Sequence, residues 1–264
     1  MDRLLVLRLE ALGCSAEALI NGIPVARVGG QHRVVTLPIH EFTLAGPNEI
    51  EMVINPGVAG MPATPEPWLA DGQACASLQL LLPRTGGLAH PSSARSLAQL
   101  GWMPGADEVV EMPARLHQGV DLPIAFPRWR WLDAPVMAQT PTLKAELAAF
   151  LLEIAVGLAK GNPEPLIQAS RLRLEDLALA YQRPMAEDVA RFRLHLQQLH
   201  AAQPLKPALP SSAKMLLRPV AGGRLTECLN MAGEPLLQSA RAEGGHVAWP
   251  LRIAAVDGQF YVLR

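Results

Sequence analysis

The sequence carries no excess charge of either sign: 23 Lys and Arg residues stand against 24 Asp and Glu residues, a formal net charge of −1 over 264 residues. A near-neutral chain has no overall field that would attract a phosphate backbone or an acidic membrane. We therefore expect neither nucleic acid nor a membrane among its partners. Half of the residues are hydrophobic, which is enough for a packed core and excludes a mainly disordered chain.

Long hydrophobic runs are missing as well. No window approaches the roughly 18 uncharged apolar residues of a membrane helix. Arg8 and Glu10 interrupt the first apolar stretch, so this stretch lacks the apolar region of a signal peptide and is typical of a strand. These absences predict a soluble protein that stays in the cytoplasm.

Cysteine and closely spaced metal ligands are scarce. Cys14, Cys75 and Cys228 are an odd number of widely separated cysteines, so we expect buried free thiols rather than a disulfide framework or a zinc site. His195 and His200 are the one close histidine pair, but five residues place them about 140° apart on a helix. Metal ligands on one helix face need a separation of three or four residues, so we expect no metal site.

The signature motifs of catalysis are absent too. The chain has no Gly-x-Ser-x-Gly elbow, phosphate-binding loop, dinucleotide-binding glycine motif, His-Glu-x-x-His helix or EF-hand loop. We therefore assign no catalytic residue and no cofactor. An enzyme whose catalytic residues are scattered along the chain would leave the same sequence.

What the chain does contain at its start is a series of β signals. Strands are expected over residues 4–10, 17–20, 23–28, 33–37 and 49–54. The pair Asn21-Gly22 lies between two apolar runs, and both residue types readily take the positive φ angles that a two-residue hairpin turn needs. This part of the chain is predicted to form a compact antiparallel sheet.

The turn residues of this region carry a family resemblance. The segments 18–25, 37–39 and 42–52 resemble the galactose-binding-like jelly roll found beside the catalytic domains of β-galactosidase-type enzymes. The resemblance covers about residues 1–85, with residues 74–82 as a returning strand. Because the shared residues belong to turns, the resemblance implies the β-sandwich fold rather than sugar binding.

Residues 61–135 are rich in proline, which fixes φ and removes a backbone hydrogen-bond donor. We expect loops and edge strands here, joining the two halves of the chain. Helices are then predicted over residues 140–161, 162–181 and 184–200. Thr140 and Pro141 supply a cap and a first helical residue, and Gly161 supplies the end of the first helix.

After residue 210 the spacing of the apolar residues changes from the helical period to that of strands. Strands are expected over residues 215–220, 224–231, 250–256 and 259–263, with turns at residues 221–223 and at Asp257-Gly258. Helices followed by a meander that ends in residues 256–264 resemble the nuclear-transport-factor-like or SnoaL-like cone. That resemblance covers about residues 140–264 and implies a curved sheet around a pocket.

The sequence thus predicts an α+β protein: an N-terminal antiparallel β-sandwich followed by a three-helix plus antiparallel meander domain. The sandwich domain with its proline-rich joining segment takes residues 1–135. The helix-plus-meander domain takes residues 136–264.

The first candidate binding cluster contains two tryptophans. In an extended segment, Trp129 and Trp131 would point to one face and Arg128 and Arg130 to the other, with Asp133 as an acceptor. The indoles would then form a platform for a sugar, a base or an arginine. The alternative, which we favour, is an edge segment whose tryptophans anchor it to a core.

The second candidate cluster lies on the expected C-terminal strands and consists of Arg218, Arg224, Glu227 and Arg252. If these side chains project into a concave sheet face, they predict a pocket for an acidic small molecule. If they cover the outside of the sheet, they form an ordinary solvated face. The sequence does not choose between these alternatives.

Two binding-type folds without a catalytic motif predict a non-catalytic binding protein. We expect its partner to be another protein, as for inhibitor, immunity or adaptor proteins, and an isologous homodimer through the sandwich is compatible with the same pattern. One alternative is an isomerase or hydrolase, which would gather two or more buried ionisable groups in a C-terminal cavity. Another is a carbohydrate-binding module that uses Trp129 and Trp131.

Overall fold

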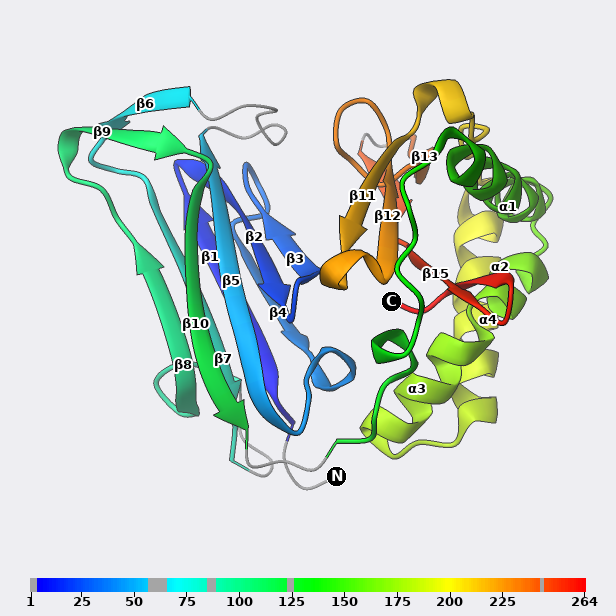
Figure 1. The fold of residues 1–264 in the computed structure, drawn as a ribbon, viewed down its shortest axis with the longest axis horizontal. Coiled ribbons are helices and arrows are strands. Elements are labelled where there is room, and N and C mark those ends of the chain that lie inside the picture. Colours follow the sequence, from blue (N-terminus) through cyan, green and yellow to red (C-terminus); the bar gives the residue numbers. More distant parts are fainter. Residues whose placement is uncertain (1–3, 57–65, 85–88, 123–125, 243–244) are drawn as a thin grey trace. The chain divides into compact units, whose positions relative to one another are not determined.

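The computed structural model describes residues 4–56, 66–84, 89–122, 126–242 and 245–264. The chain divides into two compact units, Met1–Pro127 and Arg128–Arg264. In its described residues the first unit is built from antiparallel sheets with one short 3-10 turn, His40–Phe42, and the second unit combines helices with antiparallel strands (Figure 1). The predicted α+β class, with a sandwich first and helices and strands after it, is confirmed.

Two four-stranded sheets form the first unit. One has the order β4-β1-β7-β8, with bounds Val34–Pro38, Val6–Leu12, Cys75–Leu82 and Arg95–Trp102. The other has the order β10-β5-β2-β3, with bounds Ala114–Leu122, Gly46–Pro56, Cys14–Ile20 and Ile23–Val28. A separate two-stranded sheet joins β6 (Glu66–Asp71) to β9 (Ala106–Met112).

Strand β1 shows why the first sheet has one buried and one open face. Leu7 and Leu9 are buried, and they alternate with Arg8, Glu10 and Leu12, which point the other way. Apolar side chains on the inner face fill the space between the two sheets, as in other β-sandwiches. At Arg8, Glu10 and Leu12 the outer face of this sheet is therefore partly or fully exposed.

Two asparagines of the jelly-roll resemblance act in turns. Asn21 has a φ of 52° in the turn between β2 and β3, which confirms the predicted hairpin. Its side-chain amide donates to Phe42 O and to Asn48 Oδ1, each at 2.9 Å. Asn48 Oδ1 also accepts from the backbone of Leu44 at 2.7 Å. These residues hold loops together, which is a structural task.

The proline-rich region contains more regular structure than we expected. Within its described residues it forms β6, β8, β9 and β10 in addition to β7, the expected returning strand, and β10 is nine residues long. β8 and β10 each lie at the edge of a four-stranded sheet, as predicted for this region. Pro91, Pro104 and Pro113 fall between strands, so these prolines separate strands instead of preventing them.

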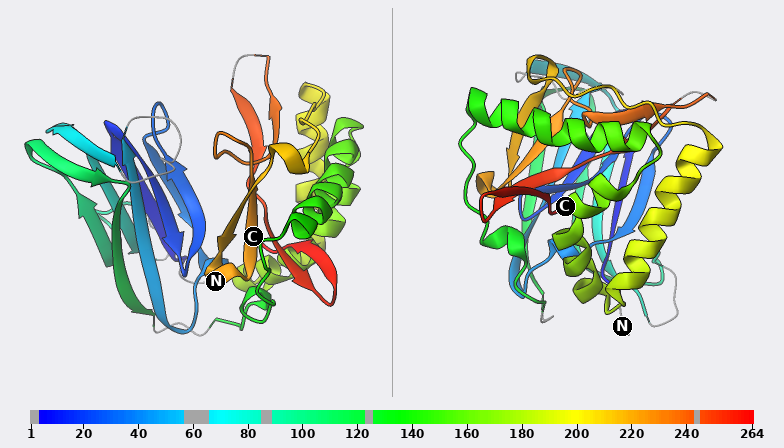
Figure 2. Two further views of the ribbon diagram at one scale, coloured as in Figure 1. Left: turned by 45° about the horizontal axis from the view of Figure 1, so that its top comes forward. Right: turned by 90° about the vertical axis from the view of Figure 1, so that its right-hand side faces the viewer.

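Helices and a meander form the second unit. The helices are α1 (Pro141–Ala159), α2 (Glu164–Ala169), α3 (Arg171–Tyr181) and α4 (Met185–Ala202). The sheet has the order β11-β12-β15-β16, with bounds Leu216–Val220, Leu225–Leu229, Arg252–Val256 and Gln259–Val262. Figure 2 shows the helices on one side of these strands, and the core between them includes Leu147, Leu196 and Ile253.

Two details of this unit differ from prediction. The expected second helix is two helices, because the chain leaves helical geometry at Ser170 (φ −96°, ψ 5°), whose N–H closes the last turn of α2. A hairpin of two four-residue strands, β13 (Leu237–Ala240) and β14 (His246–Trp249), interrupts the meander between β12 and β15. Strands this short carry too few alternating residues to stand out in a sequence.

Candidate functional site

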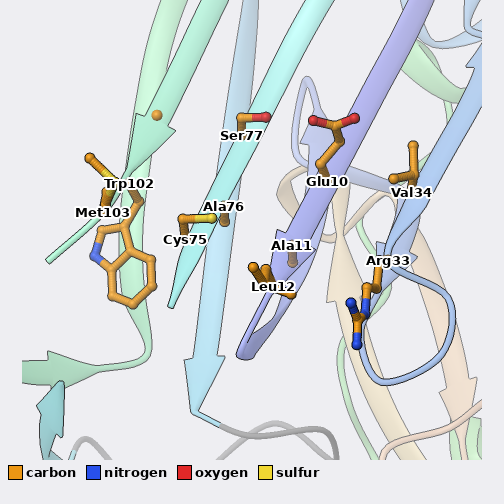
Figure 3. A pocket seen from close by; sticks show the side chains of 11 residues that line it. Glu10, Ala11, Leu12, Arg33, Val34, Cys75, Ala76, Ser77, Trp102 and Met103 are labelled. Carbon is orange, nitrogen blue, oxygen red and sulfur yellow. The ribbon is translucent and has the colours of Figure 1, made fainter. Parts of the chain in front are cut away.

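A groove of about 670 Å³ lies on the outer face of the first sheet (Figure 3). We call it the sheet groove. It spans the end of β1 and β8 and the start of β7, and it reaches the chain just before β4. The side chains that define its chemistry are Glu10, Leu12, Arg33, Val34, Cys75, Ser77, Trp102 and Met103, and Gly101 contributes backbone.

Strand register sets the order of these side chains. One row runs across the four strands through Val34, Glu10, Ser77 and Gly101. In the next row along β1, Leu12 lies opposite Cys75. Among the described residues, no atom lies within 4 Å of a Cβ built on Gly101, so the row is open at its β8 end.

The apolar residues around the sheet groove are unusually exposed. Leu12 is 43% exposed, Val34 49% and Met103 78%. Single exposed apolar residues are common, but neighbouring ones around a groove are typical of an interaction surface. This patch would lose water-exposed apolar area if a partner covered it.

Polar groups lie along the same groove. Glu10 forms an ion pair with Arg8 of the same strand, and Arg33 is exposed. Figure 3 shows the Glu10 carboxylate and Ser77 on adjacent strands, with Arg33 to the right of Leu12 and below Val34. The groove therefore offers both signs of charge beside an apolar surface.

Trp102 forms one wall of the sheet groove and packs against a second tryptophan. Its ring lies 6.1 Å from that of Trp68 on β6, at an interplanar angle of 33°. Both rings are partly exposed. Aromatic pairs at this separation attract each other and fix each other's orientation, so the wall is pre-organised.

Cys75 brings a partly exposed thiol to the groove. Behind it, the buried Cys14 donates from Sγ to Cys75 O at 3.4 Å. Burial, and then the neighbouring Cys75, raise the pKa of Cys14 from 9.0 to about 11. Cys14 is therefore an inert thiol that supports the strand carrying Cys75.

The chemistry of the sheet groove favours binding over reaction. Its described lining has one carboxylate, one guanidinium, one hydroxyl and one thiol, and no histidine that would act as a base for Ser77 or Cys75. Apolar area with a few polar groups is the usual composition of a recognition surface.

The burial of Trp129 and Trp131 contradicts the tryptophan platform and fits the anchoring alternative that we favoured, although the segment is not an edge strand. The segment is not extended, because residues Arg130–Leu132 form a 3-10 turn. Trp129 is 0% exposed and Trp131 is 3% exposed, so neither indole offers a face to a sugar or a base. Burying the two indoles in the second unit removes their apolar surface from water, which stabilises the fold.

The polar residues of that segment separate into two ion-pair groups. Arg128 and Asp133 pair with each other on the surface, with Nη2 to Oδ1 at 2.7 Å, and this contact lowers the pKa of Asp133. Arg130 instead turns to α3, where its Nη1 lies 3.0 Å from Asp176 Oδ1 and its Nη2 2.5 Å from Glu175 Oε2.

Arg264 joins the second group, although no sequence pattern singled it out. Its side chain is 0% exposed, donates to Asp176 Oδ2 at 2.9 Å, and places its guanidinium 5.7 Å from the Trp129 ring centroid. Asp176 thus lies between two arginines that are distant in sequence. The arrangement ties the start of this unit to α3 and the last strand.

The second candidate cluster is partly assembled. Arg218, Glu227 and Arg252 occupy one row across β11, β12 and β15. Glu227 Oε2 lies 3.4 Å from Arg218 Nη1 and Oε1 lies 3.2 Å from Arg252 Nη2. Arg224 is not part of the row: its Nη1 donates to Ala134 O at 2.7 Å.

The row of Arg218, Glu227 and Arg252 fits neither predicted alternative, the concave pocket or the solvated face. Cys228 and Ile253, on the opposite face, belong to the core beneath the helices. Yet Glu227 is 0% and Arg252 8% exposed, so the row is not a solvated face. The two guanidiniums share the Glu227 carboxylate, an arrangement that lets a buried charge be tolerated.

The described residues contain neither a membrane-spanning helix nor a cluster of metal ligands. None of the described helices is both long enough and apolar enough to span a bilayer. In the same residues, no group of three or more His, Cys, Asp or Glu side chains is arranged to hold a metal ion.

Comparison with protein-family models, with curated proteins and with solved structures finds no match to this chain. The resemblances to galactose-binding-like jelly rolls and to the nuclear-transport-factor-like cone therefore stay predictions. Function has to be argued from the sites themselves.

We did not predict the sheet groove from the sequence, although strand β1 contains one signal for it. In strand β1 the outward positions are Arg8, Glu10 and then Leu12, and an apolar residue at the third position breaks the polar alternation. The opposite wall had no such signal, because β8 falls in the region where we expected loops and edge strands without assigning any strand bounds.

Proposed function

We propose that this chain is a non-catalytic binding protein that holds a segment of another protein in the sheet groove. The observation that carries the proposal is the exposure of Leu12, Val34 and Met103 around one groove on an open sheet face. A partner with apolar side chains would cover these three residues. Its acidic and basic groups would meet Arg33 and Glu10 at the rim.

The same proposal places the protein in the cytoplasm. Its three cysteines are free, and free thiols persist in a reducing compartment. A homodimer through the sheet groove is an outcome that the test below distinguishes from a different partner.

The test is capture of partners from native lysate by the tagged protein and by two variants. Met103→Glu places a charge on the patch, whereas Val109→Glu places the same charge at a 66% exposed position on β9, outside the sheet groove. We expect one stoichiometric partner, identified by mass spectrometry, with the wild type and with Val109→Glu. Its recovery should fall at least about tenfold with Met103→Glu, since a buried unpaired charge is costly.

Equal recovery of that partner with both variants would refute the groove as the docking surface. Capture of the bait alone would refute the proposal of a stable protein partner. A second copy of the bait, disrupted only by Met103→Glu, would identify the partner as this chain itself.

A further inference from the structure

A second hollow lies in the helical unit, between α3 and α4, and encloses about 390 Å³. We call it the arginine groove. Its apolar surface comes from Leu174 and Leu177 on α3 and from Phe192 on α4. Leu174 is buried, and the other two are partly exposed. An apolar ligand would therefore find a floor already packed by both helices.

The rim of the arginine groove is cationic. Arg173, Arg183 and Arg191 line it, together with a single carboxylate, Asp188. The lining thus has more guanidiniums than carboxylates. A hollow with an apolar floor and surplus positive charge is complementary to an apolar anion.

Asp188 does not neutralise all of the positive charge of the arginines that line the groove. Its side chain is 8% exposed and is shared by two arginines, with Oδ2 at 3.3 Å from Arg183 Nη2 and Oδ1 at 3.6 Å from Arg191 Nη1. Both distances exceed that of a good charge-assisted hydrogen bond, about 2.8 Å. Arg191 is 64% exposed on its side chain, so it has donors available for a ligand.

The combination selects one class of ligand. The buried Asp188 would repel a doubly charged phosphate more than a singly charged carboxylate, and the leucine and phenylalanine floor suits a ring or short alkyl chain. We propose that the arginine groove binds a small apolar monocarboxylate, with its body on Leu177 and Phe192 and its carboxylate on Arg191. This site is independent of the sheet groove and of the proposed protein partner.

The test is calorimetric titration of the full chain with 1-naphthoate. We expect saturable binding at one site, and binding of the neutral 1-naphthamide at least about tenfold weaker, because the amide gives up the charge-assisted contact. Arg191→Gln should weaken 1-naphthoate about tenfold for the same reason.

Arg193→Gln is the matched control. Arg193 lies on the same helix, but its guanidinium pairs with Glu164 at 2.6 Å and does not line the groove. We expect its naphthoate affinity to change less than about twofold, since an exposed ion pair contributes little to the fold.

Leu177→Trp fills the floor without changing a charge and should abolish binding. Unchanged thermal unfolding would show that each variant is folded, and Arg183→Gln replaces Arg191→Gln if that variant is not folded. The inference is overturned by no saturable naphthoate binding, by equal losses in Arg191→Gln and Arg193→Gln, or by equal affinity for the amide.

Discussion

Asp176 is the residue on which the buried charge of the second unit depends. Its two carboxylate oxygens accept from Arg130 and from the fully buried Arg264. A buried ion pair adds little net stability, but removing one partner leaves the other charge in a poor environment. Removing Asp176 should therefore cost much more free energy of unfolding than the intact ion pairs contribute to the stability of the fold.

Asp176→Asn is expected to lower the free energy of unfolding by about 3–5 kcal/mol, because it removes the negative charge beside Arg264 and Arg130. Urea unfolding followed by circular dichroism measures the change. The control is Glu175→Gln, since Glu175 and Arg130 are both about one-third exposed; it should cost less than about 1 kcal/mol. Equal losses in the two variants would contradict this account.

The thiols provide a residue-scale prediction about pH. Burial raises the pKa of Cys14 to about 11 and, with help from Glu227, that of Cys228 to about 12. Iodoacetamide at about pH 8 should therefore label Cys75 first in the folded protein, because the thiolate is the reactive form. Peptide mass spectrometry reads the order, and labelling in guanidinium chloride should make all three sites react.

The same shifts link stability to pH. Above the ordinary thiol pKa of 9.0 the unfolded chain loses protons that the folded chain retains. The contribution of these two cysteines is thus fully present below about pH 9 and is lost as the pH rises toward 11–12. In the iodoacetamide experiment, early labelling of Cys228 in the folded protein would contradict the burial that raises its pKa.

At the scale of elements, the end of α1 shows how one residue serves two neighbours. Gly161 has a φ of 71°, directly after the C-cap residue Lys160, as is usual where a helix ends. A Cβ at this position would also lie 2.9 Å from the His200 ring of α4. Glycine is needed here for both backbone conformation and packing.

Gly161→Ala should lower the free energy of unfolding by about 2 kcal/mol, from the left-handed backbone and the clash together. Gly233→Ala separates these causes, because its φ is 77° but an added Cβ meets no described atom within 4 Å. It should cost about 1 kcal/mol. Thermal unfolding of both variants gives the comparison, and a smaller loss at Gly161 would refute the packing argument.

Elements whose signals are local were the predictable ones. Thr140 Oγ1 accepts from Leu143 N at 3.1 Å as an N-cap, and Asp257-Gly258 makes the turn between β15 and β16. Capping and turn preferences depend on a few adjacent residues, which a sequence displays. The break at Ser170 depends on how α2 and α3 pack, and adjacent residues do not encode that.

At the scale of the whole molecule, the candidate sites were the least predictable part. The sheet groove joins β1 and the approach to β4 to β7 and β8, so its walls are distant in sequence. Trp129 and Trp131 are buried, in line with the anchoring alternative that we favoured, but the 3-10 turn that carries them was not visible in a segment taken as a strand. Which polar residues meet, as Asp176 meets Arg264, follows from tertiary packing that local patterns do not specify.

The account rests on one claim for the molecule, that a partner protein contacts the sheet groove. The most direct measurement is photo-crosslinking in living cells with a benzophenone amino acid at position 103 or, as control, at position 109. Both wild-type residues are exposed, at 78% and 66%, but Met103 alone lines the groove. The account predicts one discrete adduct from position 103 and none from position 109. No adduct at position 103, or the same adduct from both positions, would contradict it.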